Sequence, residues 1–211
     1  RLQIKSISHI PEASLLRPYS EELKWNSLNP IMSDVALSDN RVDALLTTGT
    51  LKANAQYDLN TTQVDGKVQL GGLNANVSGI LEEKITVDTK ISSMNALIES
   101  VNGIYTLGEV PGVKGSAELS VELTEMKSVD ISLKSPEVIY EADAKTQHIV
   151  NDIDLAVNLQ DQQVVLNRYT LSYGGQKLYS TKPSKVLMND TNVTITPLWL
   201  NDQLKVEGAY D

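Results

Sequence analysis

The sequence predicts an all-β protein assembled from antiparallel hairpins, and three observations lead to that prediction. Apolar residues alternate with polar ones over most of the chain, as in Ile153, Leu155, Val157 and Leu159. Short turn signals such as Gly71-Gly72 separate these runs. Only one stretch has a convincing helical spacing. Each strand is therefore expected to have one apolar and one polar face.

The clearest pattern is the hairpin at residues 149–175. After the four alternating apolar residues of its first strand, Gln160–Gln163 breaks the pattern and predicts a turn. Val165, Tyr169, Leu171 and Tyr173 then resume the alternation. Asn167 interrupts it, so this residue either faces the apolar side or marks a bulge at which the phase slips by one residue.

The first 33 residues differ from the rest of the chain. Pro11, Pro18 and Pro30 interrupt every pattern, so an irregular segment with short helical turns at 12–17 and 20–28 is expected. Leu2 and Ile4 are candidates for a first strand. Residues 34–104 form a first set of strands, with the clearest runs at 51–57, 64–70, 73–77 and 85–91.

A helix is predicted over residues 92–102. Met94, Leu97, Ile98 and Val101 fall at i, i+3, i+4 and i+7; Ser93 is placed to cap the helix and Gly103 to end it. Residues 105–115 are rich in glycine and proline and predict a joint. A second set of strands occupies 116–211, at 117–123, 129–133, 138–144, 153–159, 165–173, 176–182, 193–195 and 204–210.

The composition excludes several classes of function. A net charge of −9, with 18 scattered basic residues, disfavours a nucleic-acid partner. The chain has no cysteine, which excludes disulfides, thiol nucleophiles and Cys-ligated metals. It contains no apolar run as long as a membrane span and no signal peptide. Because it opens on Arg1 and ends in mid-pattern, we expect a fragment of a larger protein.

No constellation of residues predicts catalysis. The two histidines, His9 and His148, stand apart from any nucleophile motif or second ligand. Asp152 and Asp154 share one face of a strand, but that face is the polar one, where carboxylates solvate the surface. We therefore expect no enzyme activity, no catalytic residues, no metal site and no cofactor.

Four Asn-x-Ser/Thr sequons occur, at Asn60, Asn76, Asn189 and Asn192. Asn60 and Asn192 also have an acidic residue two positions earlier, which resembles the acceptor of bacterial periplasmic N-glycosylation. These two are the candidate glycosylation sites. Turns are rich in Asn, Asp and Thr for conformational reasons as well, so the pattern alone has a second explanation.

The apolar faces pose the main question about function. Ten or more one-sided strands have a single helix to cover them, and the chain has two Trp and no Phe to fill a thick core. Such a sheet closes on itself as a self-filled sandwich or barrel, pairs with another sheet, or holds an apolar ligand.

A resemblance favours the last of these. The run ITVDTKISSMNALIESVNGIYTLGEVPGVKGSAELSVELTEMKSVDISLKSPEVIYEADAK resembles the C-terminal part of TamB proteins, of the AsmA-like superfamily, and is most similar to those of Campylobacter- and Helicobacter-like proteobacteria. GTLKANAQYDL and DQLKVEGAYD are similar to that family's recurring strand unit, and GGQKLYSTKPSKV to its late hairpin. The resemblance covers residues 49–211.

The resemblance implies a β-taco: a long, curled antiparallel or mixed sheet, open along one side, with an apolar interior and one short helix. It implies a periplasmic segment of a Gram-negative envelope protein anchored in the inner membrane, which shields phospholipid acyl chains between the two membranes. The alternative fold is a closed β-sandwich or barrel. The alternative function is a scaffold that assembles outer-membrane or autotransporter proteins by β-augmentation.

The resemblance also implies particular residues and partners. Phospholipids are the expected ligands, and an outer-membrane protein of the TamA/BamA type is the expected partner; contact with the membrane would come from other parts of the parent protein. The helix residues Met94, Leu97, Ile98 and Val101 are a candidate plug or a cap on the end of the sheet. The expected lining of the groove is Leu119, Val121, Leu123, Ile131, Leu133, Ile153, Leu155, Val157, Leu159, Leu171, Tyr173, Val193 and Ile195.

Overall fold

The structure is a computed structural model, and it describes residues 2–9, 24–107, 112–141, 146–160, 163–188 and 193–210. Sixteen strands form one sheet, with one α-helix, α1 (Met94–Ile104), and one 3₁₀ turn, η2 (Trp25–Leu28). The strands are β1 Leu2–Ser8, β2 Ile31–Ser38, β3 Arg41–Thr47, β4 Leu51–Asp58, β5 Gln63–Leu70, β6 Leu73–Ile80, β7 Lys84–Ile91, β8 Gly112–Gly115, β9 Ala117–Thr124, β10 Ser128–Glu141, β11 Gln147–Gln160, β12 Gln163–Tyr173, β13 Gln176–Ser180, β14 Ser184–Met188, β15 Val193–Leu200 and β16 Leu204–Tyr210.

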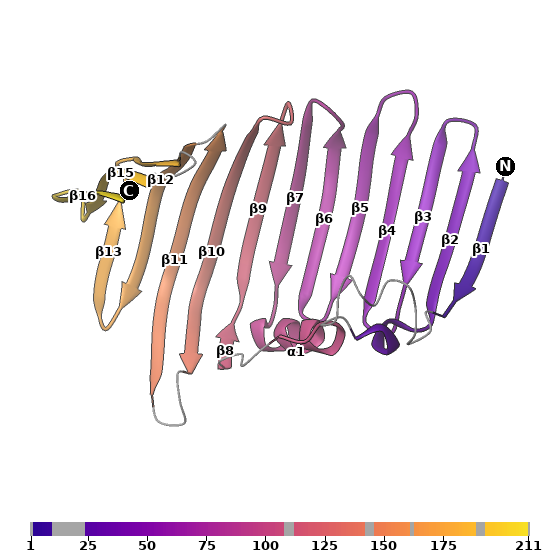
Figure 1. The fold of residues 1–211 in the computed structure, drawn as a ribbon, viewed down its shortest axis with the longest axis horizontal. Coiled ribbons are helices and arrows are strands. Elements are labelled where there is room, and N and C mark those ends of the chain that lie inside the picture. The colour runs from indigo at the N-terminus through magenta and orange to yellow at the C-terminus, as the bar shows by residue number, and fades with distance from the viewer. Residues whose placement is uncertain are drawn as a thin grey trace.

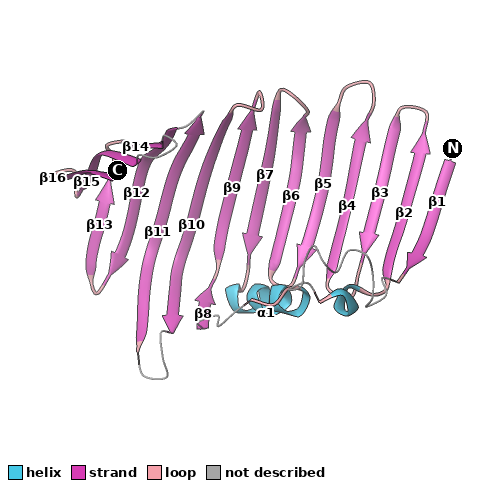
Figure 2. Cartoon of the chain, in the orientation of Figure 1, coloured by secondary structure: helices cyan, strands magenta, loops and turns pink. Residues whose placement is uncertain are grey.

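The strands follow one another across the sheet almost in chain order (Figures 1 and 2). Every pairing between the described strands is antiparallel. Within the described chain β1 and β16 stand at opposite ends of the strand order and do not pair with each other, so the sheet is curled but not closed into a barrel. The open curled sheet predicted from the resemblance is confirmed, and the closed sandwich or barrel is wrong.

The candidate first strand at the N-terminus is present. β1 pairs with β2 over its full length, from Leu2 opposite Leu37 to Ser8 opposite Ile31. The short helix predicted at 12–17 lies outside the described residues, and of the one predicted at 20–28 the described part is a 3₁₀ turn. The alternation of Leu2 and Ile4 therefore predicted β1 correctly, and the irregular segment around Pro11 and Pro18 lies outside the described residues.

Residues 105–115 do not separate two sheets. β7 pairs with β9 along eight residues, from Lys84 opposite Thr124 to Ile91 opposite Ala117. The chain leaves the sheet after β7, forms α1, adds the short strand β8 beside the lower half of β10, and returns as the next strand. The two predicted sets of strands are one continuous sheet.

The helix α1 lies across one end of the sheet, at the lower ends of β5–β7 in Figure 1. Ser93 caps it as predicted, since its side chain accepts a hydrogen bond from the backbone N–H of Ala96. The helix does not end at Gly103 but continues to Ile104, and the N–H of Tyr105 donates to the carbonyl of Val101 at 2.7 Å. Lys24 extends the C-terminal capping, because its backbone N–H donates to the carbonyl of Ile104.

Irregularities bend the C-terminal third of the sheet. The pairing of β11 with β12 skips a residue at Asn167 and another near Asp152, and the pairing of β15 with β16 shifts near Pro197. Pro136 lies inside β10 at the point where its neighbour changes from β9 to β8, so the missing N–H falls where one pairing stops. This proline explains why the sequence predicts two strands where the structure has one. Bulges of this kind increase twist and bend strands.

Side chains of the β15–β16 turn fasten the curled end. The Asp202 carboxylate accepts hydrogen bonds from the Thr181 backbone N–H and hydroxyl, both at 2.8 Å, and from the Ser180 hydroxyl. The Lys182 ammonium lies 4.0 Å from the centre of the Trp199 ring, and the Tyr169 hydroxyl donates to the Trp199 carbonyl. The hydrogen bonds from Thr181 hold the pKa of Asp202 below its ordinary value of 3.8.

The turn is expected to loosen in acid. A carboxyl group whose pKa is lower in the folded state stabilises the fold above its ordinary pKa, and that stabilisation disappears as the pH falls through the lowered value. In a Trp25→Phe background, Trp199 fluorescence should therefore change as the pH falls below 3.8. Asp202→Asn, which carries no charge at any pH, should show the altered emission already at neutral pH. A transition of equal size in the Asn variant would contradict this role for Asp202.

Candidate functional site

One apolar row crosses the sheet from β1 to β12, and we call it the central row. Residues directly opposite each other in antiparallel pairs share a face of the sheet, so the register identifies its members. Neighbouring strands lie about 4.8 Å apart, so these eleven positions extend for about 50 Å. The central row comprises Ile4, Val35, Ala44, Ala55, Gly66, Val77, Val87, Val121, Ile131, Val157 and Leu166.

A parallel row lies on each side of the central one. Between β2 and β12 none of the three rows contains a charged residue. The upper row is Leu37, Val42, Tyr57, Val64, Gly79, Ile85, Leu123, Val129, Leu159 and Val164. The lower row is Ser33, Leu46, Ala53, Val68, Ala75, Thr89, Leu119, Leu133, Leu155 and Tyr169. Together the three rows form what we call the apolar face.

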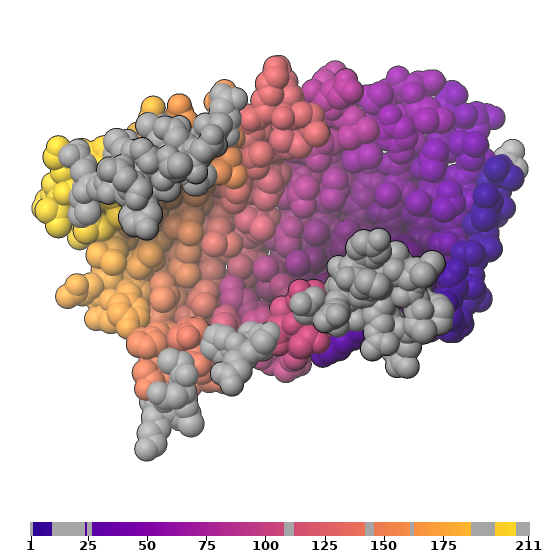
Figure 3. All heavy atoms as spheres, in the orientation of Figure 1, coloured from indigo at the N-terminus to yellow at the C-terminus, as the bar shows by residue number. Residues whose placement is uncertain are grey.

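Most residues of the apolar face are exposed or half-buried in the described part of the chain. No residue of the central row is buried, and Ile4 and Val35 expose 59% and 39% of their surface. Only four apolar residues of the described chain are buried, three of them alanines. Figure 3 shows this face, recessed across the middle strands. A sheet that filled its own interior would bury its larger side chains, so among the described residues the apolar face is not a packed core.

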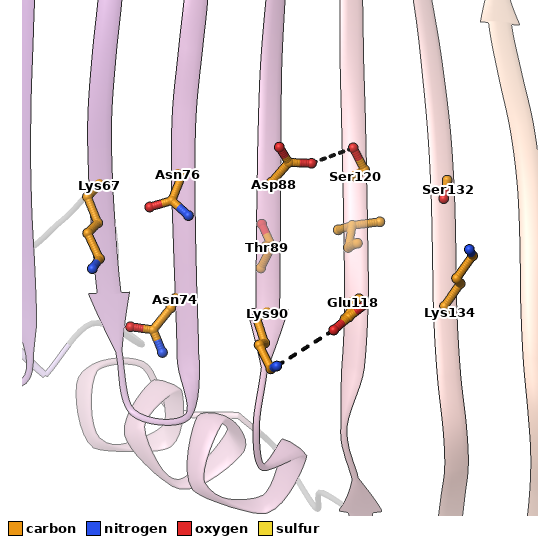
Figure 4. Close-up of a pocket in the computed structure, with 11 residues that line it drawn as sticks. Lys67, Asn74, Asn76, Asp88, Thr89, Lys90, Glu118, Ser120, Ser132 and Lys134 are labelled. Atoms are coloured by element: carbon orange, nitrogen blue, oxygen red, sulfur yellow. Dashed lines mark hydrogen bonds and ion pairs between the residues drawn. The ribbon is translucent and has the colours of Figure 1, made fainter.

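The opposite face of the sheet is polar, and Figure 4 shows it from the other side. Cross-strand pairs cover it: Lys84 with Glu122 at 2.7 Å, Lys90 with Glu118 at 3.7 Å, and the Ser120 hydroxyl donating to Asp88 at 2.6 Å. Near the C-terminal end Arg168 pairs with Asp154 at 3.3 Å. These exposed pairs contribute little stability each, but they fix which face meets water.

Small residues deepen the apolar face at β3–β5. Ala44, Ala55 and Gly66 are consecutive members of the central row, and Ala53 lies beside them in the lower row. They line a depression of about 420 Å³. Its walls include Val35, Val68 and Val77, so a flexible hydrocarbon chain could lie against apolar side chains here.

Most of the predicted lining residues lie on the apolar face. Leu119, Val121, Leu123, Ile131, Leu133, Leu155, Val157 and Leu159 all lie in the three rows. Ile153 lies one step beyond the lower row, opposite Ser135. Leu171 and Tyr173 continue the face of Tyr169 along β12. Val193 and Ile195 belong to β15, opposite Met188 and Val186, and only their backbone is described.

Asn167 marks a bulge, which was one of its two predicted positions. The slip places Val164 and Leu166 on the apolar face, while Val165 lies opposite Asn158 on the polar face. Val165 was therefore assigned to the wrong side. The same bulge turns Arg168 toward Asp154 on the polar face. An uncharged apolar face near β12 thus depends on one extra residue in the strand.

The predicted lining omitted the N-terminal half of the apolar face, from Ile4 to Val87. The sequence signal was present, since Ala53 and Ala55 alternate with polar residues as clearly as Leu155 and Val157 do. Gly66 carries no signal of its own, because glycine has no side chain to assign to a face. Only the register with Ala55 and Val77 places it in the central row.

The candidate plug residues Met94, Leu97, Ile98 and Val101 are half-buried on α1. The helix is pinned to the β5–β6 turn: the Ser92 N–H and hydroxyl both donate to the Gly72 carbonyl, at 2.8 and 3.0 Å. It covers the strand ends below the lower row and leaves the central row open. This is the position of a cap on the end of the sheet, and a plugging role stays a prediction.

Of the two candidate glycosylation sites, Asn60 lies in the exposed β4–β5 turn and Asn192 lies outside the described residues. The Asp58 carboxylate accepts hydrogen bonds from the backbone N–H groups of Asn60 and Thr61, at 2.9 and 2.8 Å. The bond from Thr61, followed by that from Asn60, lowers the pKa of Asp58. The acid before this sequon therefore shapes the turn, and the use of Asn60 as an acceptor stays a prediction.

An aromatic cluster lies at the lower margin of the apolar face. Tyr140 of β10 is opposite His148 of β11, with ring centres 6.2 Å apart. The His148 ring stacks on Tyr173 of β12 at 6.1 Å, and Nδ1 of His148 lies 2.7 Å from the Tyr173 hydroxyl. The sequence indicates an isolated histidine at position 148, because nothing in the chain order shows that three strands bring these rings together.

Within the described ranges, no group of three or more His, Cys, Asp or Glu side chains is arranged to hold a metal ion. The same ranges contain no helix long and apolar enough to cross a membrane. No protein-family model, curated protein or solved structure matches the chain.

Proposed function

We propose that this chain is a segment of a lipid-conducting groove, in which the apolar face shields the acyl chains of phospholipids from water. The observation that carries the proposal is the central row, which crosses eleven strands with no charged and no buried residue. The resemblance to TamB proteins of the AsmA-like superfamily adds a setting: a periplasmic bridge between the inner and outer membranes of a Gram-negative cell.

The physical basis is continuous shielding. Each CH₂ group removed from water contributes about 0.8 kcal/mol, so exposing a 16-carbon acyl chain costs on the order of 10 kcal/mol. A track of uniform apolar side chains removes most of that barrier at every position along it. Because the three rows hold no charge, they offer no site at which a hydrocarbon chain is trapped or repelled.

The proposal predicts that lipid accompanies the protein. When the chain is purified from a Gram-negative host in mild detergent, mass spectrometry of an organic extract should recover glycerophospholipids. Vesicles containing a labelled phospholipid should exchange label with the delipidated chain. An acidic protein of similar size, purified in parallel, controls for carry-over. The absence of both co-purified lipid and exchange would contradict the proposal.

The open edge of the sheet supports a second function, assembly by β-augmentation. Among the described strands β1 pairs with β2 alone, and its Leu2, Ile4 and Ile7 expose 58%, 59% and 71% of their surface. Such an edge is able to add a strand from a partner such as an outer-membrane protein. A photo-crosslinker at Lys5 should then trap a partner strand, and charge placed in the central row should leave that crosslink intact.

A further inference from the structure

The cluster of Tyr140, His148 and Tyr173, which we call the aromatic cluster, lies on the same side of the sheet as the lipid groove. Tyr169 belongs to the lower row, opposite Leu155. Tyr173 is four residues further along β12, where the pairing with β13 is regular, so it lies on the same face as Tyr169. The bulge near Asp152 shifts the phase of β11, so that Val150 is opposite Tyr173 and His148 shares its face. At 3.3 Å per residue the cluster stands about 13 Å below the lower row.

The polar groups of the aromatic cluster are close together, and the hydrogen bond between His148 and Tyr173 uses only one of their donor protons. The three rows contain hydroxyl groups only on Ser33, Tyr57, Thr89 and Tyr169, and no two of these residues lie opposite each other in the register. In the aromatic cluster two hydroxyls and an imidazole meet across three adjacent strands. Tyr140 and Tyr173 expose 41% and 46% of their surface, so the cluster is open to a ligand.

The ion pair between Lys114 and Glu141 belongs to the other side of the sheet. Lys114 is opposite Ile139 and bonds to Glu141 at 2.7 Å, whereas Val113 is opposite Tyr140 and Val138 is opposite Val150. Valines therefore adjoin the aromatic cluster on its own face and continue the apolar surface toward the lower row. The arrangement is an apolar surface followed by hydrogen-bonding side chains at the margin.

We propose that the aromatic cluster is a contact site for the phosphate of a glycerophospholipid whose acyl chains lie on the apolar face. Tyrosine hydroxyls and the imidazole N–H are donors, and a phosphodiester offers acceptors only. Hydrogen bonds to a charged group are stronger than those between neutral groups. Because these donors lie below the three rows, the site orients the head group at the margin without competing with movement along the rows. This inference rests on the proposed function of the groove.

The test compares two probes that share the same fluorescent acyl chain, phosphatidylglycerol and diacylglycerol. The variant Tyr140→Phe/His148→Phe/Tyr173→Phe keeps three rings and removes every polar atom of the aromatic cluster. The unaltered chain should bind phosphatidylglycerol about tenfold more tightly than diacylglycerol, as expected for hydrogen bonds to a charged group. The variant should bind both probes with the affinity of the unaltered chain for diacylglycerol.

Tyr105→Phe is the matched control, since it removes a hydroxyl from an exposed tyrosine just after α1, outside the three rows and the aromatic cluster, and should leave the preference for phosphatidylglycerol unchanged. Tyr173→Phe alone retains the His148 ring and should lower the preference in part, which covers the case of a triple variant that fails to fold. Equal binding of both probes by the unaltered chain, or an unchanged preference in the variants, would overturn the head-group site and leave the groove standing. Binding of neither probe by the unaltered chain would overturn both.

Discussion

Replacing Val157 with Asp is expected to lower the affinity of the chain for phospholipid about 100-fold. Val157 stands in the central row between Ile131 and Leu166, where an acyl chain following the row must pass. A carboxylate in contact with hydrocarbon costs about 3 kcal/mol, as measured for Asp in apolar segments, and this corresponds to about 100-fold in affinity. Binding of a fluorescent phospholipid to the purified variant gives the measurement.

The adjacent residue provides a matched control. Ala156 lies on the polar face, opposite Ser132 and Arg168, so Ala156→Asp adds the same charge to the same strand on the side that already meets water. This variant should bind lipid as the unaltered chain does. Both variants should remain folded, because neither position is buried. Equal loss of lipid binding in the two variants would show that strand stability, rather than the apolar row, governs binding.

The second large effect is expected at Gly71, in the β5–β6 turn that contacts α1. Gly71 has a φ of +53°, and a methyl group added there would meet the Ser100 side chain and lie 2.7 Å from the Ala96 carbonyl. Gly71→Ala therefore combines left-handed backbone strain with a clash against α1, and should destabilise the helix and the β5–β6 turn by about 2–4 kcal/mol. Hydrogen exchange of the α1 amides, together with thermal unfolding, measures the loss.

The variant Gly174→Ala separates the backbone strain from the clash with α1. Its φ is +57°, but a methyl group added there would have no atom within 4 Å. Gly174→Ala thus carries the backbone strain alone, and should cost about 1 kcal/mol. If both substitutions have the same effect on stability, then the contact between α1 and the β5–β6 turn contributes nothing.

Alternation in the sequence predicted the strands and faces that depend on local pattern. Leu119, Val121 and Leu123 lie on the apolar face as their spacing indicates, and Ser93 caps the helix. The helix C-terminus was missed because Gly103 is compatible with a helical backbone, and its neighbours, not its propensity, decide the outcome. β10 was predicted as two strands because Pro136 has no N–H, although the neighbouring strand changes at that residue.

Features that depend on the register between strands could not be predicted from the sequence. Gly66 enters the central row only through its partners, and Val165 leaves the apolar face only because Asn167 is bulged. The aromatic cluster joins residues separated by the β10–β11 and β11–β12 connections, and a second bulge turns His148 toward it. A slip of one residue reverses every side chain that follows, and no single residue type reports it.

The order of the strands has a consequence for how the protein unfolds. From β1 to β7, and again from β9 to β12, each strand pairs with those next to it in the chain. The hydrogen bonds that tie non-neighbouring parts of the described chain together lie at α1 and at the β15–β16 turn. Stability in such an array is a sum of nearest-neighbour terms, as in repeat proteins, so the ends should open before the middle. Calorimetric unfolding should accordingly be less cooperative than in a globular domain of this length. A groove with this property tolerates bending at one strand pair while its neighbours keep their shape.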